Sequence, residues 1–373
     1  MTQEHWIDDE RALAELVTRA SDGPAIALDT ESNGMHAYHE RVCLVQLSMP
    51  GHDAVIDPLA VDPAGLATLF ADPRVVKVMH AADNDILALA RSFALPVRGV
   101  FDTMLAARAL GWPRSGLGEI LAERFGHAAD KRWQRHDWSR RPLPAEALAY
   151  ARADTRFLLE LREQQIAELA ALDRLDDVLH ACARLERLRP RAKVFDTEGW
   201  VKIDGARKLP PEGRAVLRAL WILREEIAEQ LDRAPYRVLG NDVLRELATT
   251  RPIDPREVAR TRGVGGPAAH RYATTIASAI AAAIDGPEPA WPSPPPRPDR
   301  AFTQRFDALR SWRRDQANAR GLEPDIILGK DAMLALAEQD PKDRDALVAS
   351  GLLDEWELER YADAIVHALA RGR

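Results

Sequence analysis

Hydrophobic and polar positions in the first 110 residues alternate between short β-branched runs and helical patterns, which is typical of an α/β layer. The first three apolar runs follow one another with only short turns between them, which favours antiparallel neighbours in a sheet. Helical patterns dominate the end of this region, up to about residue 185. The predicted strands are residues 25–29, 41–48, 53–57, 75–80 and 100–102, and the predicted helices between them are residues 63–70 and 85–93. We therefore expect a mixed sheet flanked by helices.

Beyond Gly205 apolar residues recur only at helical spacing, and the chain repeats itself after 89 residues. Without a gap, this shift aligns Arg224 with Arg313 and Leu239 with Leu328. Solenoids are usually built from three or more shorter units, so two copies with this long period indicate a duplicated small helical domain.

These patterns divide the chain into four parts. The linker between the two helical copies contains seven prolines between residues 286 and 298, which predicts a semi-rigid extended segment. The expected parts are an α/β domain over residues 1–204, a helical domain over residues 205–285, the linker over residues 286–301 and a second helical domain over residues 302–373.

The composition is that of an ordinary globular protein, with 46% hydrophobic and 29% charged residues in a chain of 373. No apolar stretch approaches the ~20 residues of a membrane span, and the acidic N-terminal segment lacks the apolar part of a secretory signal. We therefore expect a cytoplasmic protein with no membrane partner. Cys43 and Cys182 are not part of a C-x-x-C pair, so neither a zinc site nor a disulfide framework is predicted.

The net charge of −7 argues against a nucleic-acid partner, but the charge differs between the domains. Residues 205–285 contain 13 basic and 10 acidic residues, a net charge of +3, whereas residues 302–373 contain 11 basic and 14 acidic residues, a net charge of −3. Residues 131–141 are more basic still, with five basic residues and two tryptophans against one aspartate. Such a segment suits phosphate attraction and base stacking, or it is a solvated loop that its tryptophans anchor to the core.

Three separate motifs carry acids that could share one site. Asp29 and Glu31 end the first predicted strand, where side-chain alternation directs both carboxylates to one side of the backbone. Tyr150 and Asp154 are four residues apart in a helical pattern, so both could reach one bound ligand. Asp85 lies at the start of a predicted helix, where the helix dipole favours an acid with or without a function. Each motif alone also fits an ordinary structural role, but together they could converge on two divalent ions, which carboxylates hold while leaving positions for phosphate.

In this order, the three motifs resemble the exonuclease motifs of the DEDD superfamily, and their context is similar to that of the ribonuclease D family. Two further features add to this likeness: the sequence His80-Ala-x-x-x-Asp85 and the pair Asp102-Thr103. Ala149 stands where the sister subfamily has a histidine, which indicates the tyrosine branch. The repeat resembles two HRDC domains, a module of helicases and ribonuclease D. The resemblance implies a ribonuclease H-like α/β exonuclease domain followed by two small all-α HRDC domains.

The same resemblance implies the roles of five residues. Asp29, Glu31 and Asp154 would bind one divalent metal ion, and Asp29 would also bridge to a second. Asp85 would support the second ion through water, and Tyr150 would orient the attacking water. Two ions, Mg²⁺ or Mn²⁺, are therefore the expected cofactors.

Residues expected to contact nucleic acid lie in basic or glycine-rich segments. Residues 262–267 offer backbone amides that could cradle a phosphate, or they form a tight turn between helices. The second helical copy is acidic at the equivalent place, so we expect it to pack against the rest of the chain or shape the entry. The expected contacts are His80, Lys131, Arg132, Arg135, Trp138, Arg141, Arg262, Gly263, Gly265 and Arg271.

The function that follows from this resemblance is a metal-dependent exoribonuclease that shortens RNA from a free 3′ end and releases nucleoside 5′-monophosphates. The resemblance implies tRNA precursors as substrates, and we expect a monomer. One alternative is a 3′–5′ DNA exonuclease of the same superfamily, which differs in how it treats the 2′-hydroxyl group. The other is a non-catalytic RNA-binding scaffold, which the intact set of acids opposes.

Overall fold

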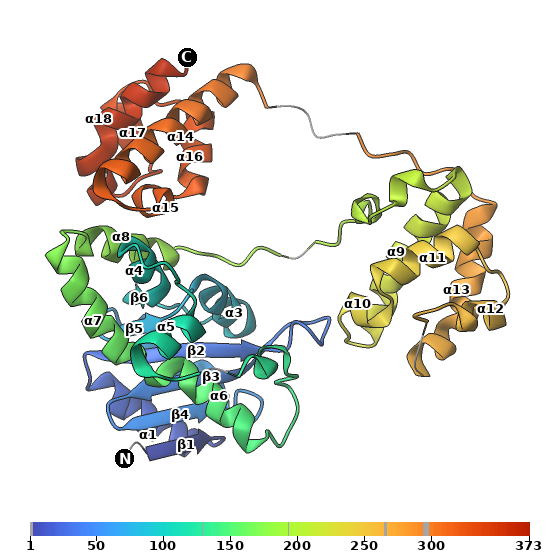
Figure 1. Cartoon of the computed structure of the whole chain (residues 1–373), viewed down its shortest axis with the longest axis horizontal. Helices are drawn as coiled ribbons and strands as arrows, with labels where there is room; N and C mark the ends of the chain where they lie inside the picture. Colours follow the sequence, from blue (N-terminus) through green and yellow to red (C-terminus); the bar gives the residue numbers. More distant parts are fainter. Residues whose placement is uncertain (1–2, 129, 193, 265–266, 294–297) are drawn as a thin grey trace. The chain divides into compact units, whose positions relative to one another are not determined.

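The protein is described by a computed structural model that covers residues 3–128, 130–192, 194–264, 267–293 and 298–373. It divides into two compact units (Figure 1). The first unit combines Met1–Glu31, Val42–Pro190 and Pro296–Arg373, and the second combines Ser32–Arg41 with Arg191–Pro295. Gly265, one of the expected phosphate contacts, lies outside the described residues.

A six-stranded mixed sheet lies at the centre of the first unit, with the strand order β1-β4-β3-β2-β5-β6. β3 pairs antiparallel with β4, as the short turn predicts, whereas the pairs β1–β4, β2–β5 and β5–β6 are parallel. The sequence pattern does not predict β1, because most of its side chains are exposed and polar. The strands are β1 (Gln3–Ile7), β2 (Ala25–Ser32), β3 (Val42–Met49), β4 (His52–Ile56), β5 (Val76–Met79) and β6 (Val100–Asp102).

Helices bury the apolar side chains of this sheet in separate clusters. Ile26 and Leu28 of β2 belong to a cluster with α1, α2 and α3, whereas the intervening Ala27 packs in another cluster with α4 and α7, because successive side chains of a strand point to opposite faces. None of the helices in the described ranges is both long and apolar enough to cross a membrane. The helical elements of this domain are α1 (Glu10–Ser21), η1 (Pro63–Leu66), α2 (Ala67–Ala71), α3 (Asp83–Phe93), α4 (Thr103–Ala109), α5 (Leu117–Phe125), η2 (Lys131–Arg135), α6 (Ala145–Arg156), α7 (Leu158–Ala171) and α8 (Leu175–Leu185).

The second helical domain shares a hydrophobic core with the sheet domain, as expected for a copy that packs against the rest of the chain. Cys182 of α8 and Ile326 of α15 belong to the same buried cluster. Arg184 of α8 donates to the carbonyl oxygens of Asp325 and Ile326 at 2.6 and 2.9 Å. The helices of this domain are α14 (Arg300–Arg320), α15 (Pro324–Ile327), α16 (Lys330–Gln339), α17 (Arg344–Ala349) and α18 (Glu355–Arg371).

The first helical domain, in the second unit, has the same architecture, so the 89-residue repeat is a structural one. Arg224 Nη1 donates to the carbonyl of Leu239 at 3.2 Å, and Arg313 Nη1 donates to that of Leu328 at 2.9 Å. Trp200 also packs in this core, which places residues 199–204 with the helical domain although the sequence pattern begins it at residue 205. Its helical elements are η3 (Gly199–Lys202), η4 (Ala206–Lys208), α9 (Pro211–Gln230), α10 (Pro235–Val238), α11 (Asn241–Thr250), α12 (Pro255–Arg260) and α13 (Pro267–Ile284).

The segment between β2 and β3 also belongs to the second unit. The Tyr38 hydroxyl donates to Glu225 of α9 at 2.9 Å, and Tyr236 and Arg237 of α10 donate to the carbonyl of Met35 at 2.6 and 2.7 Å. The loop that follows the first acid motif is therefore held by the first helical domain.

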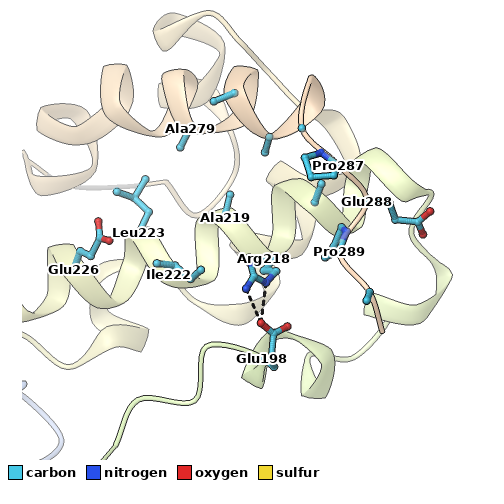
Figure 2. Close-up of a pocket in the computed structure, with 15 residues that line it drawn as sticks. Glu198, Arg218, Ala219, Ile222, Leu223, Glu226, Ala279, Pro287, Glu288 and Pro289 are labelled. Atoms are coloured by element: carbon cyan, nitrogen blue, oxygen red, sulfur yellow. Dashed lines mark hydrogen bonds and ion pairs between the residues drawn. The ribbon is translucent and has the colours of Figure 1, made fainter. Parts of the chain in front are cut away.

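A hollow of about 760 Å³ lies between α9, α13 and the start of the linker (Figure 2). Ile222, Leu223 and several alanines make most of its lining apolar, and the ion pair between Arg218 and Glu198 lies at its edge. This charged pair is already matched, and the other charged residues of the lining are Glu226 and Glu288, of which Glu288 pairs with Arg214 at 2.9 Å.

Lys77 is a charged residue inside the sheet. Its side chain is fully buried in β5, and Nζ donates to the carbonyls of Asp72 and Val75 at 2.6 and 2.7 Å. Burial lowers the pKa of Lys77 to about 8, because a charged amine loses its hydration inside the protein.

This burial predicts a pH-dependent stability. Between about pH 8 and the pKa of 10.5 that an exposed lysine has, the unfolded chain holds a proton that folded Lys77 has lost. The free energy of unfolding should therefore rise with pH across this window, by up to about 3 kcal/mol. Urea unfolding of the wild type and of Lys77→Met at several pH values measures the difference, and parallel curves would contradict a buried amine with a lowered pKa.

Candidate active site

β2 brings two of the candidate acids to one end of the sheet. Ile26, Ala27 and Leu28 are fully buried and fix the strand in the core, while Asp29 and Glu31 follow them as half-buried residues near its carboxyl end. Because side chains alternate along a strand, both carboxylates point to the same side.

The other acids come from two helices. Asp85 lies in the first turn of α3, and Thr30 Oγ1 donates to its Oδ1 at 2.5 Å, so the residue between the two β2 acids holds the third. Asp154 lies on α6, which packs through Ala147 and Ala151 onto β3 and β4. The sequence motifs point to Asp85 and Asp154, but the contact of Thr30 has no signal in the sequence beyond its position.

The structure brings the four acids together. One carboxylate oxygen from each of Asp29, Glu31 and Asp154 lies within 4.8 Å of the others. Asp85 is close enough for its charge to raise the pKa of each of these three acids. Within the described part of the chain, none of the four carboxylates forms an ion pair with a basic side chain, so the negative charges are not compensated by the protein.

Burial and mutual repulsion both oppose ionisation of these acids. Burial, followed by repulsion from Asp85, raises the pKa of Asp154 to about 7, and burial raises the pKa of Asp85 to about 6. The pKa values of Asp29 and Glu31 are also raised, first by burial and then by the neighbouring carboxylates. A donor set made only of carboxylate oxygens suits a hard divalent cation, which would supply the missing positive charge.

Tyr150 lies one helical turn before Asp154 and is held from two sides. The ring of Trp138 stacks on it with a centroid separation of 6.3 Å, and the Gln134 side chain hydrogen-bonds to its hydroxyl. Burial and the nearby acids raise the pKa of Tyr150, so the phenol remains protonated near neutral pH and can donate a hydrogen bond. Gln134 was not expected at the site, and only its place in the basic segment could have indicated it.

The side chains of the basic segment have different surroundings. Lys131, Arg132 and Arg135 are exposed on η2, and Arg132 pairs with Asp130 at 2.6 Å. Their exposure leaves them accessible to a phosphate backbone.

Three other expected nucleic-acid contacts are occupied within the protein. Trp138 is 1% exposed, so its ring faces are not accessible to a base and it supports Tyr150 instead. Arg141 donates to both carboxylate oxygens of Asp57 and to three backbone carbonyls, so its guanidinium is used in the fold. His80 Nδ1 lies 2.8 Å from Thr103 Oγ1, and burial lowers the pKa of His80.

The expected contacts of the first helical domain lie in the second unit. Arg262 is exposed, Gly263 follows it with a φ of 89°, and Arg271 is exposed on α13. A left-handed turn with exposed arginines is compatible with phosphate binding, although it equally serves as the connection from α12 to α13.

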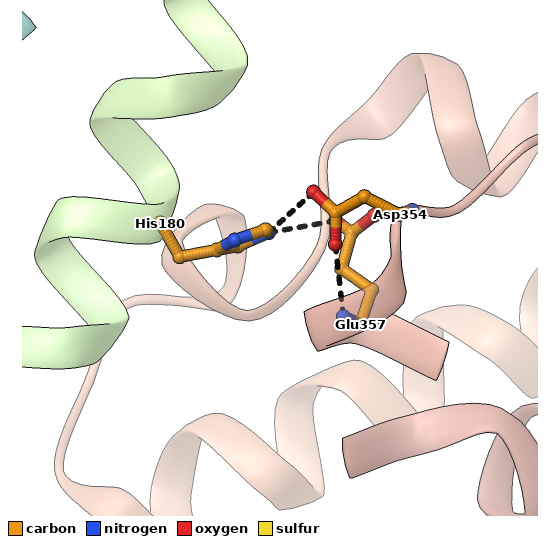
Figure 3. Close-up of side chains that lie close together, drawn as sticks. All are labelled: His180, Asp354 and Glu357. Atoms are coloured by element: carbon orange, nitrogen blue, oxygen red, sulfur yellow. Dashed lines mark hydrogen bonds and ion pairs between the residues drawn. The ribbon is translucent and has the colours of Figure 1, made fainter. Parts of the chain in front are cut away.

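A second group of potential metal ligands lies where α8 meets the start of α18 (Figure 3). His180 Nε2 lies 3.5 Å from Asp354 Oδ2 and 3.4 Å from Glu357 Oε1. Arg187 pairs with Asp354, and Arg184 Nη1 lies 3.5 Å from Glu357 Oε1. The two guanidinium groups balance the two carboxylates, so this cluster is an ionic junction between the sheet domain and the second helical domain.

Comparisons with known proteins find matches to three parts of the chain. Residues 4–169 match the family model described as 3′–5′ exonuclease, and residues 213–280 and 302–369 match that of the HRDC domain. The chain is 31% identical to ribonuclease D of Pseudomonas paraeruginosa over 374 residues, which cover 98% of this chain and 97% of the relative.

The chain is also similar to a eukaryotic exonuclease and to a solved bacterial structure. Exosome complex exonuclease RRP6 of Saccharomyces cerevisiae is 31% identical over 265 residues, which cover 67% of this chain but only 36% of the yeast protein. The crystal structure of Escherichia coli RNase D, described as an exoribonuclease involved in structured RNA processing, matches with a TM-score of 0.63 and 26% identity over 99% of both chains.

The raised pKa values predict how a divalent cation should act on stability. As pH rises from the unfolded value of 3.8 to about 7, the unfolded chain releases protons that folded Asp154 still holds, so the metal-free protein loses stability across this window. An added cation should replace the missing protons, so Mn²⁺ should raise Tm more at about pH 8 than at about pH 5.5.

Thermal unfolding of the wild type and of Asp154→Asn, each with and without Mn²⁺, measures this effect. The variant should lose most of the gain at the higher pH. An equal gain in Tm at both pH values would contradict a cation that competes with protons for these carboxylates.

Proposed function

This chain belongs to the ribonuclease D family and is a 3′–5′ exoribonuclease, and from that premise we propose that Asp29, Glu31, Asp85 and Asp154 hold two divalent metal ions, Mg²⁺ or Mn²⁺, at its active site. The observation that carries this proposal is the gathering of four carboxylates that have no basic partner among the described residues. Such a cluster is unfavourable alone and becomes favourable with bound cations.

Bound ions of this kind activate water for attack and stabilise the charge on the attacking and leaving oxygens. The protein holds the carboxylates in place through β2, α3 and α6. Tyr150 keeps its proton and orients the attacking water through a hydrogen bond, while Trp138 and Gln134 fix the position of its ring and hydroxyl. Attack at phosphorus breaks the bond to the 3′ oxygen of the preceding nucleotide, so the product is a nucleoside 5′-monophosphate.

We propose RNA with a free 3′ end as the substrate, tRNA precursors in particular, processed in the cytoplasm by a monomer. The E. coli relative is described as acting in structured RNA processing, which supports a substrate with secondary structure. The exposed side chains of Lys131, Arg132 and Arg135, together with the net charge of +3 in residues 205–285, supply positive charge for the RNA backbone.

Asp29→Asn tests the proposed site. The variant removes the Asp29 carboxylate from the proposed metal site, so we expect loss of RNA degradation. Its Tm should be unchanged or slightly higher, because repulsion of Asp29 by the three neighbouring acids is relieved. Digestion of 3′-extended structured RNA labelled at its 5′ end, with Mg²⁺ and with a chelator, measures the activity.

Asp83→Asn is the matched control, because Asp83 lies exposed on the same turn of α3 as Asp85, and it should remain active. Residual Mg²⁺-dependent cleavage by Asp29→Asn would disprove the assignment of this acid. Faster digestion of a matched DNA strand would favour the DNA exonuclease alternative, and no cleavage by the wild type with either ion would favour a non-catalytic scaffold.

Tyr150→Phe tests the role of the phenol. Removing the hydroxyl should lower kcat roughly tenfold to a hundredfold and leave KM for RNA nearly unchanged, because the group acts mainly on the transition state. Tyr361→Phe, at a buried tyrosine of the second helical domain, is the control and should keep wild-type turnover. A rise in KM without a change in kcat would instead assign Tyr150 to substrate binding.

A further inference from the structure

The turn that leads to Asp85 lacks local support. Only residues 80–82 connect β5 to α3, and Ala81 adopts a left-handed conformation with a φ of 57°. Ala82 occupies the N-cap position of α3 and has no side chain that could cap the helix. Residues other than glycine rarely adopt this conformation, so contacts from elsewhere must hold the turn.

Asp102, at the end of β6, provides these contacts. Its Oδ1 accepts hydrogen bonds from the backbone N–H groups of Ala81, Met104 and Leu105 at 3.2, 2.8 and 3.2 Å, and its Oδ2 accepts one from Ala82 at 2.9 Å. The Asp102 carboxylate, in a residue that is 2% exposed, therefore caps α4 and also binds the two residues that directly precede α3.

The residue that follows Asp102 ties the same turn to β5. Thr103 Oγ1 donates to the carbonyl of Met79 at 3.0 Å and lies 2.8 Å from His80 Nδ1. β5 and β6 pair in parallel with Met79 opposite Asp102, so the two residues reach the turn from the neighbouring strand. The backbone between Met79 and Ala82 is thus anchored by consecutive side chains.

We propose that Asp102 is a positioning residue that sets the place of Asp85 in the active site. Thr30 holds the Asp85 carboxylate from β2, and Asp102 holds the backbone at the start of the helix that carries it. The acids of a metal site must be held in place closely, because a displacement of about 1 Å can cost on the order of a hundredfold in rate. This inference rests on the proposed function of Asp85 as a metal-site acid.

Two substitutions separate positioning from simple helix capping. In Asp102→Asn, the NH₂ group takes the place of one carboxylate oxygen and faces backbone N–H groups that donate to the carboxylate in the wild type. Either the Ala82 contact or the three contacts to Oδ1 are therefore lost. Asp102→Ser keeps a side chain that can cap α4, but a hydroxyl on one carbon cannot also reach Ala81 and Ala82. Asp9→Ser changes the N-cap of α1, far from the motif in sequence, and serves as the matched control.

The measurement is the Mg²⁺ dependence of RNA cleavage, together with Mn²⁺ binding by calorimetry. For both Asp102 variants we expect the ion concentration at half-maximal activity to rise about tenfold, with weaker Mn²⁺ binding and a KM for RNA within about twofold of the wild type. Asp9→Ser should lower Tm at most slightly and leave the ion dependence unchanged. Variants of Asp102 with a lower Tm but a wild-type ion dependence would overturn the proposal and leave Asp102 as a structural cap only.

Thr103→Val keeps the inference testable if the Asp102 variants do not fold. It removes the hydroxyl that binds the same turn and should raise the ion concentration at half-maximal activity, but by less than the Asp102 variants do. Thr103→Ser keeps a hydroxyl and should restore the wild-type ion requirement. An unchanged ion requirement in folded Thr103→Val would overturn the proposal. A wild-type enzyme that needs no metal ion would contradict the proposed function itself. A metal-dependent wild type with ion-insensitive Asp102 variants contradicts only the positioning role.

Discussion

Repulsion among four carboxylates at the end of β2 is the constraint to which the rest of the catalytic domain responds. Burial and then the neighbouring carboxylates raise the pKa values of Asp29, Glu31 and Asp154, so ionisation of the cluster opposes the folded state unless protons or cations join it. Flexible segments would let such groups move apart. Here one pair is built into a buried strand, and the other two acids lie on helices packed against the sheet.

Much of this arrangement could be predicted from the sequence, and the failures have physical reasons. The five strands with apolar runs, the helical repeat and the ribonuclease D family are confirmed, because each leaves a periodic or spaced pattern of residue types. β1 was missed because its contribution is backbone pairing with β4 rather than apolar burial. The contact between Thr30 and Asp85 depends on how β2 and α3 meet in space, which the one-dimensional pattern does not contain.

The basic segment shows why charge and aromatic content predict nucleic-acid contacts only in part. Lys131 and Arg132 are exposed as expected, but Trp138 is buried under Tyr150 and Arg141 is bound to Asp57. A tryptophan or arginine counts equally in the composition of a segment whether its side chain faces solvent or fills a gap between strands and helices. Only the packing decides between these roles, and Trp138, expected to stack on a base, packs against Tyr150 instead.

The core that joins the sheet domain to the second helical domain is discontinuous along the chain. Side chains of residues 101–182 share it with side chains of residues 309–369, and the first helical domain is made in between. During synthesis, the catalytic domain leaves the ribosome with the surface around α8 still uncovered, and it must wait while more than a hundred further residues are translated. The hydrophobic core that the sheet domain shares with the second helical domain can therefore close only after α18 has been translated.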